Sequence, residues 1–219
     1  MTCVAEKVTA FVVRETAAGR QVLLFRHPSA GIQIPAGTVE AGEAPVAAAL
    51  REGQEETGLL NLAVVRLLGI HQVELDGDLA VIGAACTVYS RPDPASWDWA
   101  RLPRGATVYI VRRKGDWVQV DFQENNRFPD PEYLTFRVIG WVRAEILCTT
   151  LRRHFYLLTP TAPAPDAEWA VEIDYHIFRP FWAPEDKVLQ SGGDVVESQR
   201  QWLEYLRGPF DGVARVDAR

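Results

Sequence analysis

Cysteine, methionine and histidine are scarce in this chain of 219 residues, which has three cysteines, one methionine and four histidines. Cys3, Cys86 and Cys148 lie far apart in the sequence and show no spacing typical of metal ligands. We therefore expect three reduced thiols, which is the usual state of cysteine in a cytoplasmic protein.

Long hydrophobic runs and an excess of positive charge are also missing. We expect no leader peptide, because no charged segment followed by an apolar one opens the chain, and no membrane span. The net charge of −6 argues against general nucleic-acid binding, which favours basic surfaces. The hydrophobic content of 47% is ordinary for a globular protein, and the length suits one large domain or two small ones.

The most informative segment is 37–59, which reads GTVEAGEAPVAAALREGQEETGL. A helix over Ala44–Thr57 would place Glu52, Glu55 and Glu56 in one narrow stripe, because residues three and four apart are neighbours on a helix. Like charges at this spacing destabilise an isolated helix by about 0.2–0.5 kcal/mol per pair. A divalent cation would remove that repulsion, and hard carboxylate ligands in this arrangement suit Mg²⁺ or Mn²⁺.

The rest of the predicted helix gives it a place in a fold. Gly58 follows the last helical position, where glycine commonly ends a helix. An ion pair between Glu43 and Arg51 would join the preceding loop to the helix. The face opposite the acids is small or apolar and is expected to pack on a sheet; it carries Val46, Leu50, Gly53 and Thr57.

These residues resemble the Nudix box, the signature of hydrolases that act on nucleoside diphosphates linked to another group. Gly53 departs from the pattern, because the family usually has an aliphatic residue or alanine there. Glycine costs about 1 kcal/mol relative to alanine inside a helix, but this change removes no ligand. The matching positions are Gly37, Glu43, Arg51, Glu52, Glu55, Glu56, Gly58 and Leu59.

The resemblance implies the α/β class, with a Nudix α/β/α sandwich in which a mixed sheet lies between the box helix and a C-terminal helix. It also implies a Mg²⁺-dependent hydrolase that cleaves the pyrophosphate bond of a nucleotide-type small molecule. The metal would be held by Glu52, Glu55 and Glu56, together with the Gly37 carbonyl. Glu43 and Arg51 would be structural. A carboxylate of the box or one outside it would take a proton from the attacking water.

Candidate groups also lie outside the box. Residues Glu168–Phe178 alternate between apolar and polar, which predicts one strand whose polar face includes Glu172 and Asp174. These two are candidate general bases if that face meets the box helix, and a solvent-facing acidic strand is the alternative. His27, between a strand and the box loop, is a candidate for substrate binding.

Other segments indicate the remaining sheet. Lys7–Val13 and Gln21–Phe25 are apolar, β-branched runs joined by a polar turn, which predicts a hairpin. Leu62–Leu75 is predicted as a strand broken by Gly69, and Arg153–Thr159 as a further strand. Asp194–Leu206 has apolar residues at helical spacing and predicts a closing helix packed on the sheet.

The middle of the chain differs from this scheme, because it contains many short strand-like runs separated by turns. The motifs Gly115-Asp116-Trp117-Val118 and Gly140-Trp141-Val142 resemble bacterial Src-homology-3-like domains. We therefore predict a small β-barrel at 80–148, inserted into a discontinuous Nudix domain formed by 1–79 and 149–219.

Two roles for the insert stay open. Trp97, Trp99, Trp117 and Trp141 would form an aromatic surface for a peptide or a partner domain. Alternatively, Trp117 and Trp141 form the barrel core, and the insert shapes the active-site cleft or a homodimer interface. A second class of function is a non-catalytic sensor that binds a nucleotide metabolite and signals through the insert. Nothing in the sequence selects the substrate.

Overall fold

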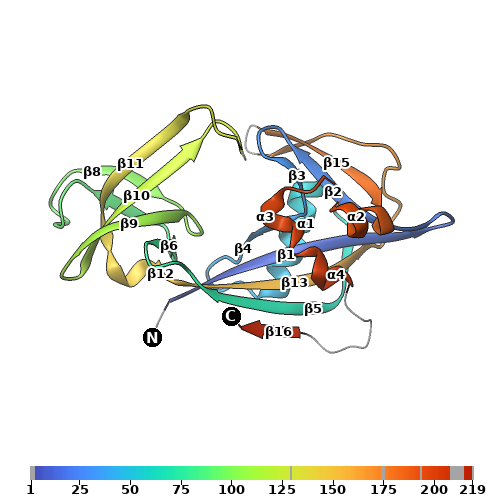
Figure 1. Ribbon diagram of the computed structural model, residues 1–219, viewed down its shortest axis with the longest axis horizontal. Helices are drawn as coiled ribbons and strands as arrows, with labels where there is room; N and C mark the ends of the chain where they lie inside the picture. Colours follow the sequence, from blue (N-terminus) through green and yellow to red (C-terminus); the bar gives the residue numbers. More distant parts are fainter. Residues whose placement is uncertain (1–2, 129, 174–175, 193, 208–214, 219) are drawn as a thin grey trace.

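The structure is a computed structural model, and it describes residues 3–128, 130–173, 176–192, 194–207 and 215–218. Two lobes lie side by side (Figure 1). One is built on a mixed sheet with helices on both faces, and the other is formed by strands. The chain leaves the first lobe after the strand β5 (Leu62–Glu74) and returns to it through the strand β13 (Thr150–Pro160).

The sheet of the first lobe has nine strands among the described residues, in the order β14-β15-β2-β1-β13-β5-β16, with β3 on β2 and β4 on β1. β1 is parallel to β13 and β16 is parallel to β5, while the other neighbours are antiparallel. The strands are β1 (Val4–Thr16), β2 (Gly19–His27), β3 (Gly31–Gln33), β4 (Ala36–Thr38), β5 (Leu62–Glu74), β13 (Thr150–Pro160), β14 (Val171–Ile173), β15 (His176–Pro184) and β16 (Arg215–Ala218).

The strands predicted from apolar runs are confirmed. β1 and β2 form the expected hairpin, closed at the pair Thr16–Gly19, and both strands are longer than predicted. β5 and β13 are the predicted strands on either side of the middle segment. They pair from Glu74–Thr150 to Leu62–Pro160, so they join the ends of that segment back to the sheet.

Alternation along β1 sorts its side chains between two cores. Val8, Ala10 and Val12 pack under the helix α1 (Pro45–Thr57). Phe11 packs on the opposite face with residues of the C-terminal helices. These helices are α2 (Glu185–Ser191), α3 (Glu197–Arg200) and α4 (Leu203–Arg207), so the sheet lies between α1 and α2–α4 as predicted.

The predicted single strand over Glu168–Phe178 is wrong. The chain reverses there, and β14 and β15 form a hairpin that pairs Glu172 with Ile177. A single strand would place these two residues on opposite faces, whereas paired residues share a face. Alternation alone does not mark a reversal, because both arms of a hairpin continue it. Asp174 lies outside the described residues.

The predicted closing helix over Asp194–Leu206 is also wrong in its extent. Asp194 has a φ of 61°, and Val195 forms a bridge with Ile32, so neither residue is helical. The segment instead forms the two short helices α3 and α4. The predicted packing is confirmed, because Val195, Leu203 and Leu206 are buried against the sheet.

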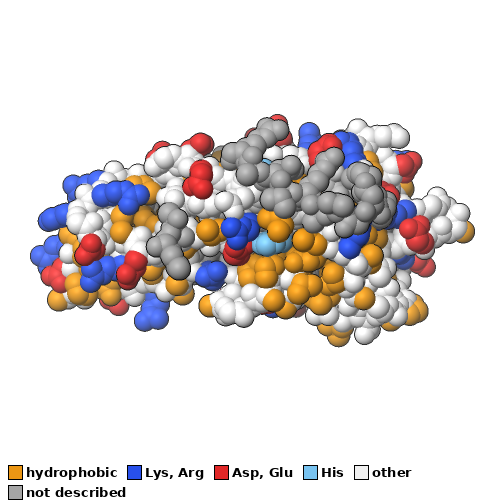
Figure 2. Space-filling view, turned by 90° about the horizontal axis from the view of Figure 1, so that it is seen from below, with side chains coloured by type: hydrophobic (Ala, Val, Ile, Leu, Met, Phe, Trp, Pro, Cys, Tyr) orange, Lys and Arg blue, Asp and Glu red, His pale blue; other side chains and the backbone are white. Residues whose placement is uncertain are grey.

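The described residues of the second lobe form a seven-stranded sheet in the order β12-β6-β9-β10-β11-β7-β8. Its own apolar cluster includes Val108, Val118 and Val142. On the face shown in Figure 2, Lys and Arg side chains gather over this lobe, at the left. Its strands are β6 (Leu79–Ile82), β7 (Cys86–Tyr89), β8 (Asp98–Leu102), β9 (Thr107–Lys114), β10 (Trp117–Asn125), β11 (Leu134–Arg143) and β12 (Leu147–Cys148).

The tryptophans of this lobe divide into two pairs. Trp97 and Trp99 are exposed. Trp117 and Trp141 are buried, but they lie outside the lobe's apolar cluster as far as the structure describes it. The guanidinium of Arg143 lies 4.3 Å from the Trp117 ring centre, and Arg112 covers Trp141 at 5.1 Å. The two rings are therefore buried, as one of the two predicted roles has it, but arginine side chains cover them and the lobe's apolar cluster does not include them.

The prediction of three free thiols is wrong, because two of the cysteines are bonded to each other. Cys3 and Cys148 form a disulfide, with their Cα atoms 4.5 Å apart, and Cys86 is free. The parallel pairing of β1 with β13 begins at Val4–Thr150 and brings the two cysteines together. Their separation of 145 residues hides this proximity in the sequence. The state of the cysteines therefore does not support the predicted cytoplasmic location. No helix among the described residues has the length and apolar character needed to cross a membrane.

Candidate active site

The helix α1 begins and ends close to where the sequence places it. Pro45 occupies its first turn, where a missing N–H costs nothing. Gly58 ends it with a φ of 71°, and its N–H donates to the Gln54 carbonyl. Val46 is 39% exposed, so the prediction that it packs on the sheet is wrong. The buried face consists of Ala48, Ala49, Gly53 and Thr57.

Arg51 connects the helix to the loop before it. Its guanidinium donates to both carboxylate oxygens of Glu43 at 3.0 Å and to the Thr38 carbonyl at 3.0 Å. The predicted ion pair of Arg51 with Glu43 is therefore present, and it lowers the pKa of Glu43. The same guanidinium donates to Glu52 at 2.9 Å and to Glu55 at 3.0 Å. Both the loop and the acids of α1 are thus oriented by one arginine.

Glu52 lies against the backbone of Gly37. A Cβ built at position 37 would lie 1.9 Å from the Glu52 carboxyl carbon, so any other residue there would displace this side chain. The Glu52 side chain is 13% exposed, and burial raises its pKa despite the neighbouring Arg51. A glycine is required at this position because the carboxylate occupies the space of a side chain.

Glu56 is the most deeply placed acid of the helix. It accepts a hydrogen bond of 2.8 Å from the Ala36 N–H, and no ion pair to it occurs among the described residues. Burial raises its pKa to about 8, and the charges of Glu52 and Glu55 act in the same direction. A buried carboxylate with no cation is unfavourable, so this site favours a bound cation.

The donor set fits Mg²⁺ or Mn²⁺. Within the described ranges, no three acidic, histidine or cysteine side chains converge into a ready-made metal cage. Arg51 accounts for part of this, because it holds the carboxylates of Glu52 and Glu55. Mg²⁺ needs only one or two protein carboxylates and completes its shell with water and phosphate. Glu52, Glu56 and the Gly37 backbone can supply such a partial shell.

His27 lies at the end of β2, in an aromatic group with two residues of β15. Its ring centre is 4.9 Å from Phe178 and 5.5 Å from His176. Its Nδ1 accepts a hydrogen bond of 3.1 Å from the Ser29 N–H. Burial, and then His176, lowers the pKa of His27. Sequence reasoning missed His176, because only the β2–β15 pairing brings it beside His27.

Glu172 is exposed on the outermost strand, β14. The segment leading to β14 contacts the C-terminal end of α1, where the Trp169 indole donates to the Thr57 carbonyl at 2.8 Å. The structure brings together the acids of the box, and the role of Glu172 as a general base stays a prediction.

The second lobe contacts the loop before α1, which the sequence did not predict in detail. Arg104, between β8 and β9, donates to the Val39 carbonyl at 2.7 Å. Lys7 on β1 donates to the Gly105 carbonyl at 3.3 Å. A Cβ at Gly105 would lie 2.3 Å from the Thr38 hydroxyl. The turn that carries Arg104 and Gly105 is thus docked on the box loop.

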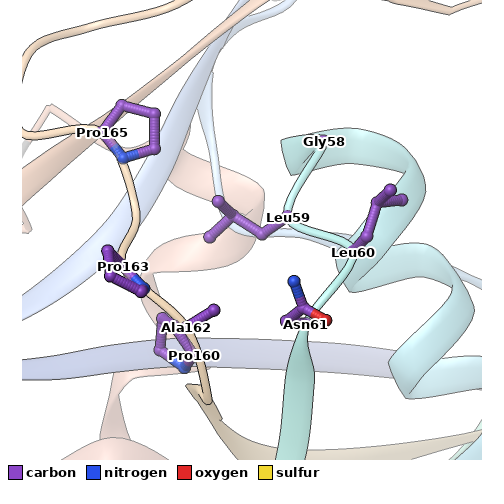
Figure 3. A pocket seen from close by; sticks show the side chains of 8 residues that line it. All are labelled: Gly58, Leu59, Leu60, Asn61, Pro160, Ala162, Pro163 and Pro165. Carbon is purple, nitrogen blue, oxygen red and sulfur yellow. The ribbon is translucent and has the colours of Figure 1, made fainter.

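A cavity of about 270 Å³ lies at the other end of α1 (Figure 3). None of its lining residues is ionisable, so the cavity lacks the charged groups that Glu52, Glu55 and Glu56 provide on α1. The lining consists of Gly58, Leu59, Leu60, Asn61, Pro160, Ala162, Pro163 and Pro165.

No curated protein matches this chain. Similar solved structures include a putative NUDIX hydrolase from Listeria monocytogenes, with 14% identity over 91% of this chain and 90% of that one, at a TM-score of 0.43. A MutT protein from Methanosarcina mazei has 15% identity over 94% and 95%, at 0.42. An Ap4A hydrolase from C. elegans has 12% identity over 93% and 96%, at 0.41.

The decisive comparison is with family models. The model of the NUDIX domain matches residues 5–155, which include most of the box-bearing lobe and the whole inserted segment. The chain therefore belongs to the Nudix family and is a pyrophosphohydrolase of the Nudix type.

Proposed function

We propose that this protein is a divalent-metal-dependent hydrolase that cleaves the pyrophosphate bond of a nucleoside diphosphate linked to another moiety, or of a nucleoside triphosphate. The observation that carries the proposal is the buried pair of carboxylates, Glu52 and Glu56, beside the Gly37 backbone. Glu56 has no ion pair among the described residues, and Glu52 shares Arg51 with Glu43 and Glu55, so a metal–diphosphate complex would add the counter-charge.

The box residues have two proposed roles, metal binding and support of the loop. Glu52, Glu55, Glu56 and the Gly37 carbonyl would hold Mg²⁺ or Mn²⁺, with Glu55 leaving Arg51 to do so. The bound metal would lower the pKa of a water molecule and neutralise charge on the diphosphate. Arg51 and Glu43 keep a structural role, because their bidentate pair fixes the loop against the helix.

The general base is proposed among the carboxylates. Glu56 uses one oxygen to accept the Ala36 N–H, which leaves its other oxygen available to a water. Glu55 is the most exposed of the box acids and is a second candidate within the cluster. Glu172 and Asp174 remain the candidates outside the box.

A substrate contact is proposed for His27. Its lowered pKa keeps the imidazole neutral at pH 7, so its ring can stack on a base or donate one hydrogen bond. The β2–β15 pairing places it with Phe178 and His176, which gives the substrate an aromatic surface.

The inserted lobe is proposed to be a domain of the Src-homology-3-like type over 80–148, with 1–79 and 149–219 as the Nudix domain. Support comes from its separate apolar cluster and from its docking on the box loop. Of its two predicted roles, shaping the active site is the one these contacts favour. A peptide or domain partner, a homodimer through this lobe and a cytoplasmic location remain predictions.

The proposal is tested with Glu56→Gln and a matched control, Glu40→Gln. Glu40 is an exposed acid of the same loop, so its replacement changes the charge equally. We expect Glu56→Gln to lower Mg²⁺-dependent hydrolysis by about 10²–10⁴-fold and Glu40→Gln to leave it unchanged. Mn²⁺ titration by calorimetry should show weakened metal binding in Glu56→Gln alone.

The substrates for this test are a panel of nucleoside triphosphates, nucleotide sugars, ADP-ribose and Ap4A, with each product identified. Undiminished turnover in Glu56→Gln would contradict the role of the box. Binding without turnover across the panel, with both metals present, would favour the sensor that signals through the inserted lobe.

A further inference from the structure

Two cations lie side by side on the face of the sheet opposite α1. The parallel register of β1 and β13 pairs Lys7 with Arg153. Phe11 on β1 and Phe155 on β13 belong to the core beneath α4, and residues two or four apart on a strand share a face. Lys7 and Arg153 therefore lie on the α2–α4 side, at the end of the sheet where the box loop joins β1.

The hydrogen-bond partners of both cations are neutral. The Arg153 guanidinium donates to the Val8 carbonyl at 2.9 Å and to the Thr9 hydroxyl at 3.1 Å. Its central carbon lies 4.1 Å from the Trp202 ring centre. The Lys7 amine donates to the Gly105 carbonyl of the inserted lobe. No ion pair to Lys7 or Arg153 occurs among the described residues.

The protonation equilibria reflect this missing counter-charge. Burial lowers the pKa of Arg153 to about 10. Burial, and then the charge of Arg153, lowers the pKa of Lys7 to about 8, and Glu52 alone acts in the opposite direction.

Arg152, the neighbour of Arg153 in the sequence, differs from it in having a carboxylate partner. It points to the other face of the sheet, where it donates to Glu6 at 2.9 Å and to Gln72 at 2.8 Å. Glu6 thus supplies a carboxylate for Arg152, whereas no carboxylate among the described residues pairs with Arg153. A buried cation without a counter-ion is strongly unfavourable, and it suits a site that an anion completes.

We propose that Lys7 and Arg153 form an anion-binding subsite for a phosphate group of the substrate, next to the phosphates held at the Nudix box. Lys7 pairs with Thr38 in β4, and the charge of Glu52 raises the pKa of Lys7, so the subsite lies close to the box acids although it is on the other face of the sheet. The guanidinium of Arg153 can bind two phosphate oxygens at once, and the amine of Lys7 adds a point charge. The substrate class is then a nucleotide with a phosphate beyond the one bound through the metal. This assignment of the anion to the substrate rests on the proposed function.

The test is calorimetric titration of inorganic pyrophosphate into the metal-free protein, in EDTA at pH 7. The variants are Arg153→Gln, Lys7→Gln and Lys7→Arg, and Arg152→Gln is the control on the opposite face. We expect pyrophosphate affinity to fall about 10-fold or more in Arg153→Gln and Lys7→Gln, because each loses a charge-assisted contact. Lys7→Arg should retain most of the affinity, and Arg152→Gln should bind as the unmodified protein does.

A second measurement keeps the proposal testable if a variant is unstable. Pyrophosphate should raise the thermal midpoint of the unmodified protein above that in chloride of equal ionic strength, and should not do so in Lys7→Gln. Equal binding in Lys7→Gln and the unmodified protein, or an equal loss in Arg152→Gln, would overturn the subsite. Absent hydrolysis with intact pyrophosphate binding would instead overturn the proposed function and leave the subsite standing.

Discussion

Glu55 and Glu56 are adjacent in the sequence but differ in their surroundings. Glu55 has a side chain that is 52% exposed and pairs with Arg51. Glu56 is turned toward β4, accepts the Ala36 N–H and has no cation beside it among the described residues. Two consecutive residues of α1 therefore differ: the carboxylate of Glu55 is solvated, whereas burial disfavours the ionised form of Glu56. The difference gives Glu56 a titration that can be observed.

We expect the metal-free protein to lose stability as the pH rises from about 4.5 to about 8. Burial raises the pKa of Glu56 from 4.5 to about 8, so the folded state binds more protons than the unfolded state within this window. The stabilising contribution is fully present below the unfolded pKa and is lost as the pH rises through the folded pKa. Unfolding in urea with EDTA, at pH 5 and pH 8, measures the change.

Glu56→Gln removes this titration, so the variant should lose less stability than the unmodified protein between the two pH values. Glu40→Gln is again the control and should keep the full loss, because Glu40 is exposed. If Glu56→Gln and Glu40→Gln had the same pH dependence, Glu56 would not be the buried acid that the structure describes.

The residues of this site that the sequence predicts are those joined by local geometry. Glu52, Glu55 and Glu56 follow from helical spacing, and the Glu43–Arg51 pair spans a short loop. Lys7 and Arg153 could not be found in this way. Their proximity depends on a parallel pairing between strands 146 residues apart in the chain, and no local pattern specifies that register.

At the scale of elements, the box loop is held from two sides. The helix contributes Arg51, which donates to the Thr38 carbonyl. The inserted lobe contributes Arg104, which donates to the Val39 carbonyl, and Gly105, which packs on the Thr38 side chain. The position of Gly37, next in the loop, thus depends on an element that a minimal Nudix domain would not need.

Gly105→Ala should disturb the box loop and weaken metal binding. Gly105 has a φ of +85°, and an added Cβ would lie 2.3 Å from the Thr38 hydroxyl, so both strain and contact displace the turn. We expect Mn²⁺ affinity to fall several-fold and amide exchange of Val39 to rise. Strain of this kind costs about 1–3 kcal/mol.

Gly115→Ala is the control that separates backbone strain from the contact with Thr38. Gly115 also has a positive φ, +56°, but nothing lies within 4 Å of its Cβ position. It should therefore lower stability without changing metal affinity or the exchange of Val39. Equal metal affinity in Gly105→Ala and Gly115→Ala would show that docking of the turn does not position the loop.

Elements with a strong local pattern were predicted well, and those defined by reversals were not. The β1–β2 hairpin and α1 carry apolar periodicity together with turn or end signals. The β14–β15 reversal leaves period-two alternation intact, so it reads as one strand. The C-terminal helix is shorter than predicted because Asp194 has a φ of 61° and Val195 pairs with Ile32, so neither residue is helical.

At the scale of the whole molecule, the two lobes are joined where the chain passes from β5 to β6 and from β12 to β13. The Cys3–Cys148 disulfide lies at this junction, in an apolar group with Ala5 and Val81. Gly83 lies against it, because a Cβ there would be 2.7 Å from both sulfur atoms. The bond therefore ties the start of the Nudix sheet to the last strand of the inserted lobe.

Cys148→Ser should destabilise the oxidised protein, because it removes a crosslink between residues that are 145 apart in the sequence. In the chain-entropy model, a closed loop of this length contributes up to about 5 kcal/mol to the free energy of unfolding. Guanidinium unfolding without reductant measures the loss, and dithiothreitol should reduce the stability of the unmodified protein toward that of the variant.

Cys86→Ser is the matched control and should respond to dithiothreitol as the unmodified protein does, since Cys86 is free. A count of three reactive thiols in the unfolded, unreduced protein would contradict the bond itself, whereas one thiol supports it. Arg104 donates both to the Val39 carbonyl and to the carbonyl of Gly83, which lies against the disulfide, so metal affinity should fall together with stability in Cys148→Ser and remain unchanged in Cys86→Ser.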